Sequence, residues 1–197
     1  MYQRGVVLAT TDGGRTWTRQ RPPRVAKLRA VAFWDANQGC AVGAFGTILI
    51  TSDGGETWNE RRSGTRAQLN AVAFADATHL WVVGYSGTVL ASEDGGKTWV
   101  KQEWGTKKSL NGISFPGSRR GWVVGDGGMI CTTDDGGSTW RRQDWEVEGQ
   151  DDSERGLPYF VERSDVDLHA IDFVDTLHGW IAADDYIIST TNGGDPL

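Results

Sequence analysis

The residues of this sequence that could do chemistry lie mainly in one repeated octapeptide. The stretch TTDGGRTW at 10–17 returns as TSDGGETW at 51–58, SEDGGKTW at 92–99 and TDDGGSTW at 133–140, and a partial copy, TTNGGDPL, follows at 190–197. Read singly, each full copy offers a carboxylate that could act as an acid catalyst or a calcium ligand. A calcium site needs about six oxygen ligands, however, and each copy supplies only one or two carboxylates. Catalysis also needs one constellation of groups rather than one per repeat, so the repetition favours a structural role.

The pattern [ST]-x-D-x-G-x-x-W is typical of a tight hairpin turn. Glycine supplies the positive φ that such a turn requires. The aspartate and the Ser or Thr hydroxyl can bond back to backbone N–H groups of the turn, and the tryptophan is expected to bury a large area and fix the hairpin to its sheet. The residues predicted to have this structural role are Thr10, Asp12, Gly14 and Trp17; Thr51, Asp53, Gly55 and Trp58; Ser92, Asp94, Gly96 and Trp99; and Thr133, Asp135, Gly137 and Trp140.

The elements that must position these turns form a repeat with a period of 41 residues, the spacing of the four tryptophans. One unit reads LRAVAF, GCAVG, TILIT and TWNERR, which we interpret as four short strands, a to d, because the apolar residues lack helical spacing. Strand d is polar, as an outer edge strand should be. Four strands in a period of about 40 residues are typical of a β-propeller blade.

The sequence therefore predicts an all-β fold, a β-propeller of four-stranded blades. We expect full blades over 27–62, 69–104 and 110–145, partial blades over 1–20 and 168–197, and an acidic insertion over 146–167. These segments give three full blades and two partial ones, so we expect an incomplete propeller, a fragment of a longer one. The alternatives are a compact closed ring and a ring completed by a second copy.

Composition and charge exclude several classes of protein. The net charge of −6 lies in the insertion, which has eight acidic and two basic residues, so the remainder is neutral and lacks the basic footprint of nucleic-acid binding. No apolar run approaches about 18 residues, so no membrane span is expected. The first residues, MYQRGVVLATT, lack the apolar core of a signal peptide.

The cysteines and histidines give no sign of a metal or cofactor site. Cys40 and Cys131 lie in apolar runs and are predicted to be buried free thiols, with a disulfide as the alternative. No two of His79, His169 and His178 have the spacing of metal ligands. We therefore predict no metal and no cofactor.

The octapeptides resemble the Asp-boxes, or bacterial neuraminidase repeats, of sialidases, sortilin-type receptors and some endoglucanases. The wider pattern, with AVAF, GWVVG and DGG-x-TW in one register, is most similar to photosystem II assembly or stability factors and their bacterial relatives. That resemblance implies a non-enzymatic scaffold that contacts a partner protein through an arginine-rich patch. It also suggests an extracytoplasmic location, in the periplasm, the thylakoid lumen or secreted.

A partner would meet the face opposite the Asp-boxes, where the b–c turns and the d–a loops of a propeller lie. Three of these loops are basic, and the acidic insertion forms the fourth, with an apolar stretch, LPYFV, at 157–161. Ordinary solvated charge is the alternative interpretation of the basic loops. The candidate partner-binding residues are Arg21, Arg24, Lys27, Arg66, Lys107 and Lys108.

The alternative function is glycoside hydrolysis. It needs two carboxylates held about 5–10 Å apart. Candidates in the b–c turns are Asp126, Asp184 and Asp185, for which turn formation is the simpler explanation. A sialidase nucleophile is a tyrosine paired with a glutamate, and for none of the four tyrosines does the sequence identify such a partner, so we assign no catalytic residue.

Overall fold

Short antiparallel strands joined by tight turns make up the chain in the computed structural model, which describes residues 6–23, 27–143, 145, 166–184 and 187–194. Blade A comprises β1 (Leu8–Ala9) and β2 (Thr18–Arg19), and blade B comprises β3 (Leu28–Phe33), β4 (Gly39–Gly43), β5 (Ile48–Thr51) and β6 (Asn59–Arg61). Blade C comprises β7 (Leu69–Phe74), β8 (Leu80–Gly84), β9 (Thr88–Ser92) and β10 (Val100–Gln102). Blade D comprises β11 (Leu110–Ser114), β12 (Gly121–Gly125), β13 (Met129–Thr133) and β14 (Arg141–Arg142), and blade E comprises β15 (Leu168–Phe173), β16 (Gly179–Ala183) and β17 (Ile187–Thr190).

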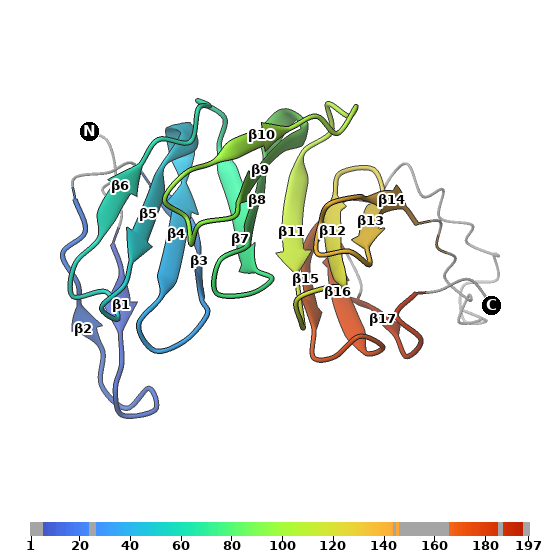
Figure 1. Cartoon of the computed structure of the whole chain (residues 1–197). Coiled ribbons are helices and arrows are strands. Elements are labelled where there is room, and N and C mark those ends of the chain that lie inside the picture. Colours follow the sequence, from blue (N-terminus) through green and yellow to red (C-terminus); the bar gives the residue numbers. More distant parts are fainter. Residues whose placement is uncertain (1–5, 24–26, 144, 146–165, 185–186, 195–197) are drawn as a thin grey trace.

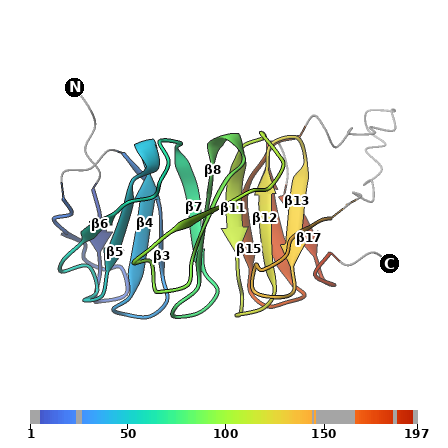
Figure 2. The same ribbon diagram turned by 45° about the horizontal axis from the view of Figure 1, so that its top comes forward.

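Each blade is a meander in which sequential strands pair. The strand orders are β3-β4-β5-β6, β7-β8-β9-β10, β11-β12-β13-β14 and β15-β16-β17, with β1 paired to β2. The first strands of neighbouring blades contact one another, β3 with β7, β7 with β11 and β11 with β15, so they form the inner wall of the assembly. The blades stand side by side in an arc (Figures 1 and 2). This arrangement confirms the predicted all-β propeller and its incomplete ring.

The hydrophobic core lies between the blades. Strands b and c are buried along nearly their whole length in blades B to D, because each packs on two sides. One buried cluster joins Val42 of blade B to Leu69 of blade C, and others join blade C to blade D and blade D to blade E. Each blade therefore depends on its neighbours for burial.

A β-bulge recurs in strand a of blades B to E. The register with strand b shifts after the first residue, at Leu28, Leu69, Leu110 and Leu168. Two of the residues left at the bulge are asparagines that bridge blades: Asn70 Nδ2 donates to the carbonyl of Leu110 at 2.9 Å, and Asn111 Nδ2 donates to that of Leu168 at 3.0 Å. The innermost strands are thus joined by side-chain hydrogen bonds as well as by packing.

Both cysteines are buried and free, as predicted. Burial raises the pKa of the Cys131 thiol to about 11, against the opposing effect of Arg142, and it also raises the pKa of Cys40. Across the part of the chain that the structure describes, no helix has the length and apolar character needed to span a membrane. Of the predicted features, Arg24, Asp185 and residues 146–165 lie outside the described residues.

Candidate functional site

Every Asp-box closes its turn with the same hydrogen bonds. In blade B the Thr51 hydroxyl donates to Asp53 Oδ1 at 2.7 Å and accepts the N–H of Gly55 at 2.8 Å. Asp53 in turn accepts the backbone N–H of Thr57 at 2.9 Å and its hydroxyl. The same pattern is present at Thr10, Asp12 and Thr16, at Ser92, Asp94 and Thr98, and at Thr133, Asp135 and Thr139.

The threonine before each tryptophan is a box residue that the sequence pattern left open. Thr16, Thr57, Thr98 and Thr139 each supply two donors to the aspartate. The signal was present in the sequence, since all four full copies end in Thr-Trp. The glycine pairs have the positive φ that the turn requires, for example 69° and 88° at Gly54 and Gly55.

These hydrogen bonds fix the charge state of the box aspartates. The Thr57 hydroxyl, then the Thr57 N–H and the Thr51 hydroxyl, lower the pKa of Asp53 to about 2. The equivalent donors lower the pKa of Asp12 and of Asp135 to about 2. A carboxyl that stays ionised in this way is poorly suited to donate a proton near neutral pH. The box carboxylates are therefore unsuitable as acid catalysts.

The partial fifth box keeps part of this network. The Thr190 hydroxyl donates to Asn192 Oδ1 at 2.8 Å, and the N–H of Gly194 approaches both side chains at 2.9 Å. The amide of Asn192 thus replaces the carboxylate as the acceptor within the turn.

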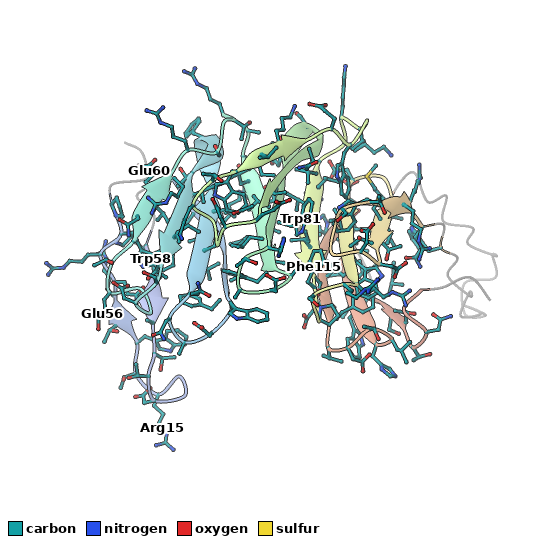
Figure 3. All side chains as sticks on the ribbon, in the orientation of Figure 1. Arg15, Glu56, Trp58, Glu60, Trp81 and Phe115 are labelled. Carbon is teal, nitrogen blue, oxygen red and sulfur yellow. The ribbon has the colours of Figure 1, made fainter. Side chains whose placement is uncertain are left out.

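The box tryptophans lie at the junctions between blades. Trp58, 5% exposed, makes an edge contact with Phe33 at 6.0 Å, and its Nε1 donates to Gln20 of blade A at 3.0 Å. Trp140 makes edge contacts with Trp81 of blade C at 5.7 Å and with Phe115 at 5.8 Å. Figure 3 labels the two partner rings, Trp81 and Phe115. These tryptophans therefore join their own blade to the preceding one.

Trp17 departs from the expectation that each box tryptophan buries a large area, because 59% of its surface is exposed. The physical reason is the absence of a neighbour: among the described residues, no blade precedes blade A. The burial of a box tryptophan thus depends on the adjoining blade and not on the hairpin alone.

The opposite end of the propeller carries what we call the loop face, formed by the b–c turns (44–47, 85–87, 126–128) and the described parts of the d–a loops (21–23, 27, 62–68, 103–109, 145, 166–167). Each b–c turn is tied to the loop that enters its blade. The N–H groups of Ala44, Tyr85 and Asp126 donate to the carbonyls of Lys27, Gln68 and Ser109, each at 2.9 Å. At Gly84 the approach is so close that a Cβ would lie 2.2 Å from the carbonyl oxygen of Gln68. The loop face is thus supported by backbone contacts.

Five of the six candidate partner-binding residues are described, and all five are exposed in or beside the d–a loops: Arg21, Lys27, Arg66, Lys107 and Lys108. Lys108 Nζ lies 3.3 Å from the carbonyl of Gly127, which ties it to the neighbouring b–c turn. The structure therefore brings predicted basic side chains to one end of the molecule.

Sequence reasoning missed two exposed aromatic residues of the loop face, Phe45 and Tyr85. Phe45 is 66% exposed and has a φ of 57°, a conformation that is rare for a bulky residue. With Arg62 and Arg66 it lines an open depression of about 660 Å³. Ser86 and Gly127 have the same conformation at the equivalent positions, with φ of 55° and 62°, so the positive φ belongs to the repeated b–c turn, and it is the exposed ring that adds Phe45 to the candidate surface.

Two of the three carboxylates proposed for glycoside hydrolysis, Asp126 and Asp184, lie in the described residues, and both already make hydrogen bonds to nearby side chains. Asp126 Oδ1 accepts from Asn111 Nδ2 at 2.8 Å, and Asp184 Oδ1 lies 2.7 Å from His169 Nε2. The hydrogen bond with His169 holds the pKa of Asp184 below its usual value, whereas a glycosidase acid needs a raised pKa. Asp184 is therefore unsuited to be that acid.

The other histidines pair with turn aspartates. His79 Nδ1 lies 2.8 Å from Asp76, and His178 Nδ1 lies 2.9 Å from Asp175, both in a–b turns. Within the described ranges, no three His, Cys, Asp or Glu side chains come together as a metal site would require.

The fold and the boxes define this chain as an Asp-box β-propeller. A family model described as the photosynthesis system II assembly factor YCF48 matches residues 62–152. The chain is thus similar to photosystem II assembly factors, as the sequence pattern predicted. No curated protein sequence gives a significant match.

Solved structures of propellers resemble the chain over most of its length. YCF48 from Cyanidioschyzon merolae is 17% identical with a TM-score of 0.70, over 96% of this chain and 64% of that one. A structure of YCF48 bound to D1 peptide is 22% identical with a TM-score of 0.54, over 85% and 66%. A GH74 enzyme from Niastella koreensis is 18% identical with a TM-score of 0.68, over 94% and 33%. These likenesses establish the fold, and the chain spans slightly less than two thirds of either YCF48 structure.

Proposed function

We propose that this propeller is a non-enzymatic scaffold that binds a segment of a partner protein on its loop face. The observation that carries the proposal is the composition of that face. It combines exposed cations at Arg66, Lys107 and Lys108 with the exposed aromatic rings of Phe45 and Tyr85. Aromatic and arginine side chains are the types that most often dominate binding at protein interfaces.

The comparisons support a peptide as the partner. One structural neighbour, YCF48, is described as bound to D1 peptide. The basic side chains on this chain would favour an acidic segment, and charges of this kind mainly accelerate association and lose their effect as salt rises.

Fluorescence anisotropy with labelled peptides from the D1 protein tests the proposal. Charge reversal of Arg66, Lys107 and Lys108 together should weaken binding at least about tenfold at low ionic strength and flatten its dependence on salt. The matched control reverses Arg15, Lys97 and Arg119, which are exposed at the Asp-box end, so the net charge changes equally. That variant should bind as the wild type does.

Two outcomes would contradict the scaffold. Equal loss of binding in both triple variants would show a nonspecific charge effect. Turnover of a panel of glycosides at mildly acidic pH, abolished by Asp126→Asn, would replace the scaffold with glycoside hydrolysis.

A further inference from the structure

Three of the four junctions between blades share one hydrogen bond. The carbonyl of the first box glycine accepts a side-chain N–H from the preceding blade. Gly54 accepts from Gln20 Nε2 at 3.0 Å, Gly136 accepts from Trp81 Nε1 at 3.1 Å, and Gly193 accepts from Trp122 Nε1 at 3.4 Å. The junction between blades B and C is the exception, since no described side chain donates to the carbonyl of Gly95.

The exception arises from a paired change on strands b and c of blade B. Cys40 takes the position that Trp81 and Trp122 occupy in blades C and D. Its cross-strand partner is Ile50, where Trp81 faces Ala91 and Trp122 faces Thr132. A large residue on strand c thus accompanies the small one on strand b.

Ile50 replaces only part of the missing indole. A Cβ on Gly96 would lie 2.4 Å from Ile50 Cδ1, just as one on Gly137 would lie 2.2 Å from the Trp81 ring, so the isoleucine reaches the same box. It has no N–H group, however, and cannot pair with the carbonyl of Gly95. Blade B therefore keeps the apolar contact of this junction and lacks its polar one.

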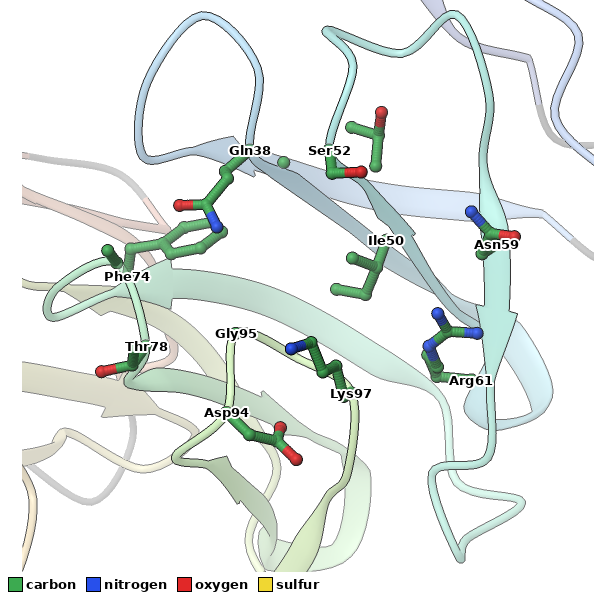
Figure 4. A pocket seen from close by; sticks show the side chains of 13 residues that line it. Gln38, Ile50, Ser52, Asn59, Arg61, Phe74, Thr78, Asp94, Gly95 and Lys97 are labelled. Carbon is green, nitrogen blue, oxygen red and sulfur yellow. The ribbon is translucent and has the colours of Figure 1, made fainter.

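A cavity of about 220 Å³ remains at this junction, which we call the B–C cavity. Ile50, Phe74 and Gly95 line it, as do the charged residues Arg61, Asp94 and Lys97; in Figure 4 Lys97 lies between Asp94 and Arg61. An apolar cavity of about 150 Å³ is enough to hold a benzene ring. The B–C cavity therefore has room for a ring of the size of indole.

We propose that the B–C cavity binds an indole-type ring, whose N–H donates to the carbonyl of Gly95 as Trp81 and Trp122 do one and two blades further on. The charged side chains of the lining are Arg61, Lys97 and Asp94, so two cations outnumber one carboxylate and favour a ligand that also carries a carboxylate. Most of the lining comes from the Asp-box end of the blades, and Arg61 is the one lining residue that the site shares with the depression on the loop face.

Ligand-observed NMR titration of the whole chain tests the proposal with indole-3-acetate. We expect a dissociation constant on the order of a millimolar, as for other ligands of this size. Naphthalene-1-acetate, which lacks the N–H, should bind about five- to tenfold more weakly. Equal binding of the two probes, or no binding of either, would overturn the proposal.

A third probe distinguishes the source of the ring. N-acetyl-tryptophanamide presents the same ring without a carboxylate, as a peptide would. Tighter binding of indole-3-acetate supports a free indole acid as the ligand, and binding of the amide that is equal or tighter supports a tryptophan side chain. Both results support the indole site.

Two variants close the cavity in different ways. Cys40→Trp combined with Ile50→Ala rebuilds the arrangement of blade C and should abolish indole binding while keeping the fold, as followed by circular dichroism. Ala77→Phe blocks the cavity from a turn outside the core and should weaken binding at least about tenfold even if the double variant fails to fold.

The matched control is Ser118→Phe, which makes the equivalent change one blade further on, where Trp81 already fills the junction. Binding should be unchanged in this control. Binding that persists in Ala77→Phe, or falls equally in Ser118→Phe, would place the ligand elsewhere and overturn the proposal.

Discussion

At the residue scale, the Asp-box is a small hydrogen-bonding unit in which three side chains depend on one another. The Thr51 hydroxyl links Asp53 to the backbone of Gly55, and Thr57 binds the same carboxylate through its N–H and its hydroxyl. A carboxylate accepts several donors at once, which a neutral side chain does less well. This explains why an aspartate, which suggests chemistry when read alone, can recur once per blade.

Replacing Asp53 by alanine should lower the melting temperature by about 3–6 °C, because the donors of Thr51 and Thr57 lose their shared acceptor. Thermal unfolding followed by circular dichroism measures the change. Glu56→Ala is the control, since Glu56 is exposed in the same turn. A melting temperature that falls equally in both variants would count against the network.

The box carboxylates should also govern stability in acid. The pKa of Asp12, Asp53 and Asp135 is about 2 in the folded chain, below the value of about 4 for an unfolded aspartate. A lowered pKa stabilises the fold above pH 4, and that stabilisation is lost as the pH falls from about 4 to about 2. Urea denaturation at a series of pH values should show this loss, and Asp53→Asn should make it smaller; an identical pH profile in Asp53→Asn would contradict this origin.

At the element scale, the c–d hairpin is held by its neighbours as much as by its own turn. Trp58 and Trp140 close junctions with the preceding blade, while Trp17 has no such junction in the described chain. The same sequence motif therefore lies in two different environments. Replacing its tryptophan should lower the free energy of unfolding by different amounts in the two.

Trp58→Ala should destabilise the chain by about 3–5 kcal/mol, the usual cost of removing a buried aromatic side chain. Trp17→Ala should cost less than about 1 kcal/mol, because its ring is mostly in water already. Denaturant unfolding of both variants measures the difference. Similar costs would mean that the contacts within the hairpin dominate.

The 41-residue period and the apolar pattern of the sequence predicted the strands and the box turns well, because four strands and one box recur in a fixed register. Topology alone placed the basic loops at the end opposite the boxes. The paired change at Cys40 and Ile50 was beyond such reasoning, because it appears only once the cross-strand register is known. The bridges made by Asn70 and Asn111 depend on a bulge that the sequence does not mark, and the exposure of Phe45 depends on its backbone conformation.

At the scale of the whole molecule, the blades form a row in which the buried clusters join each blade to its immediate neighbours. The free energy of unfolding of such a repeat protein is close to the sum of one contribution from each blade and one from each junction between neighbouring blades. The two ends of the described arc differ from its middle at equivalent positions, since Trp17 in blade A and Trp180 in blade E are exposed whereas Trp58 and Trp122 are buried. The loop face spans several blades, so a partner bound there would also hold neighbouring blades together.

The two buried thiols have a consequence for how this row opens. Cys40 lies in blade B and Cys131 in blade D, and each is shielded by the packing of its own junction. A thiol reacts only when water and reagent reach it and it can ionise. The rate at which a thiol reagent modifies each cysteine therefore reports how often its blade junction opens. Comparing the two rates would tell whether the blades separate one at a time or together.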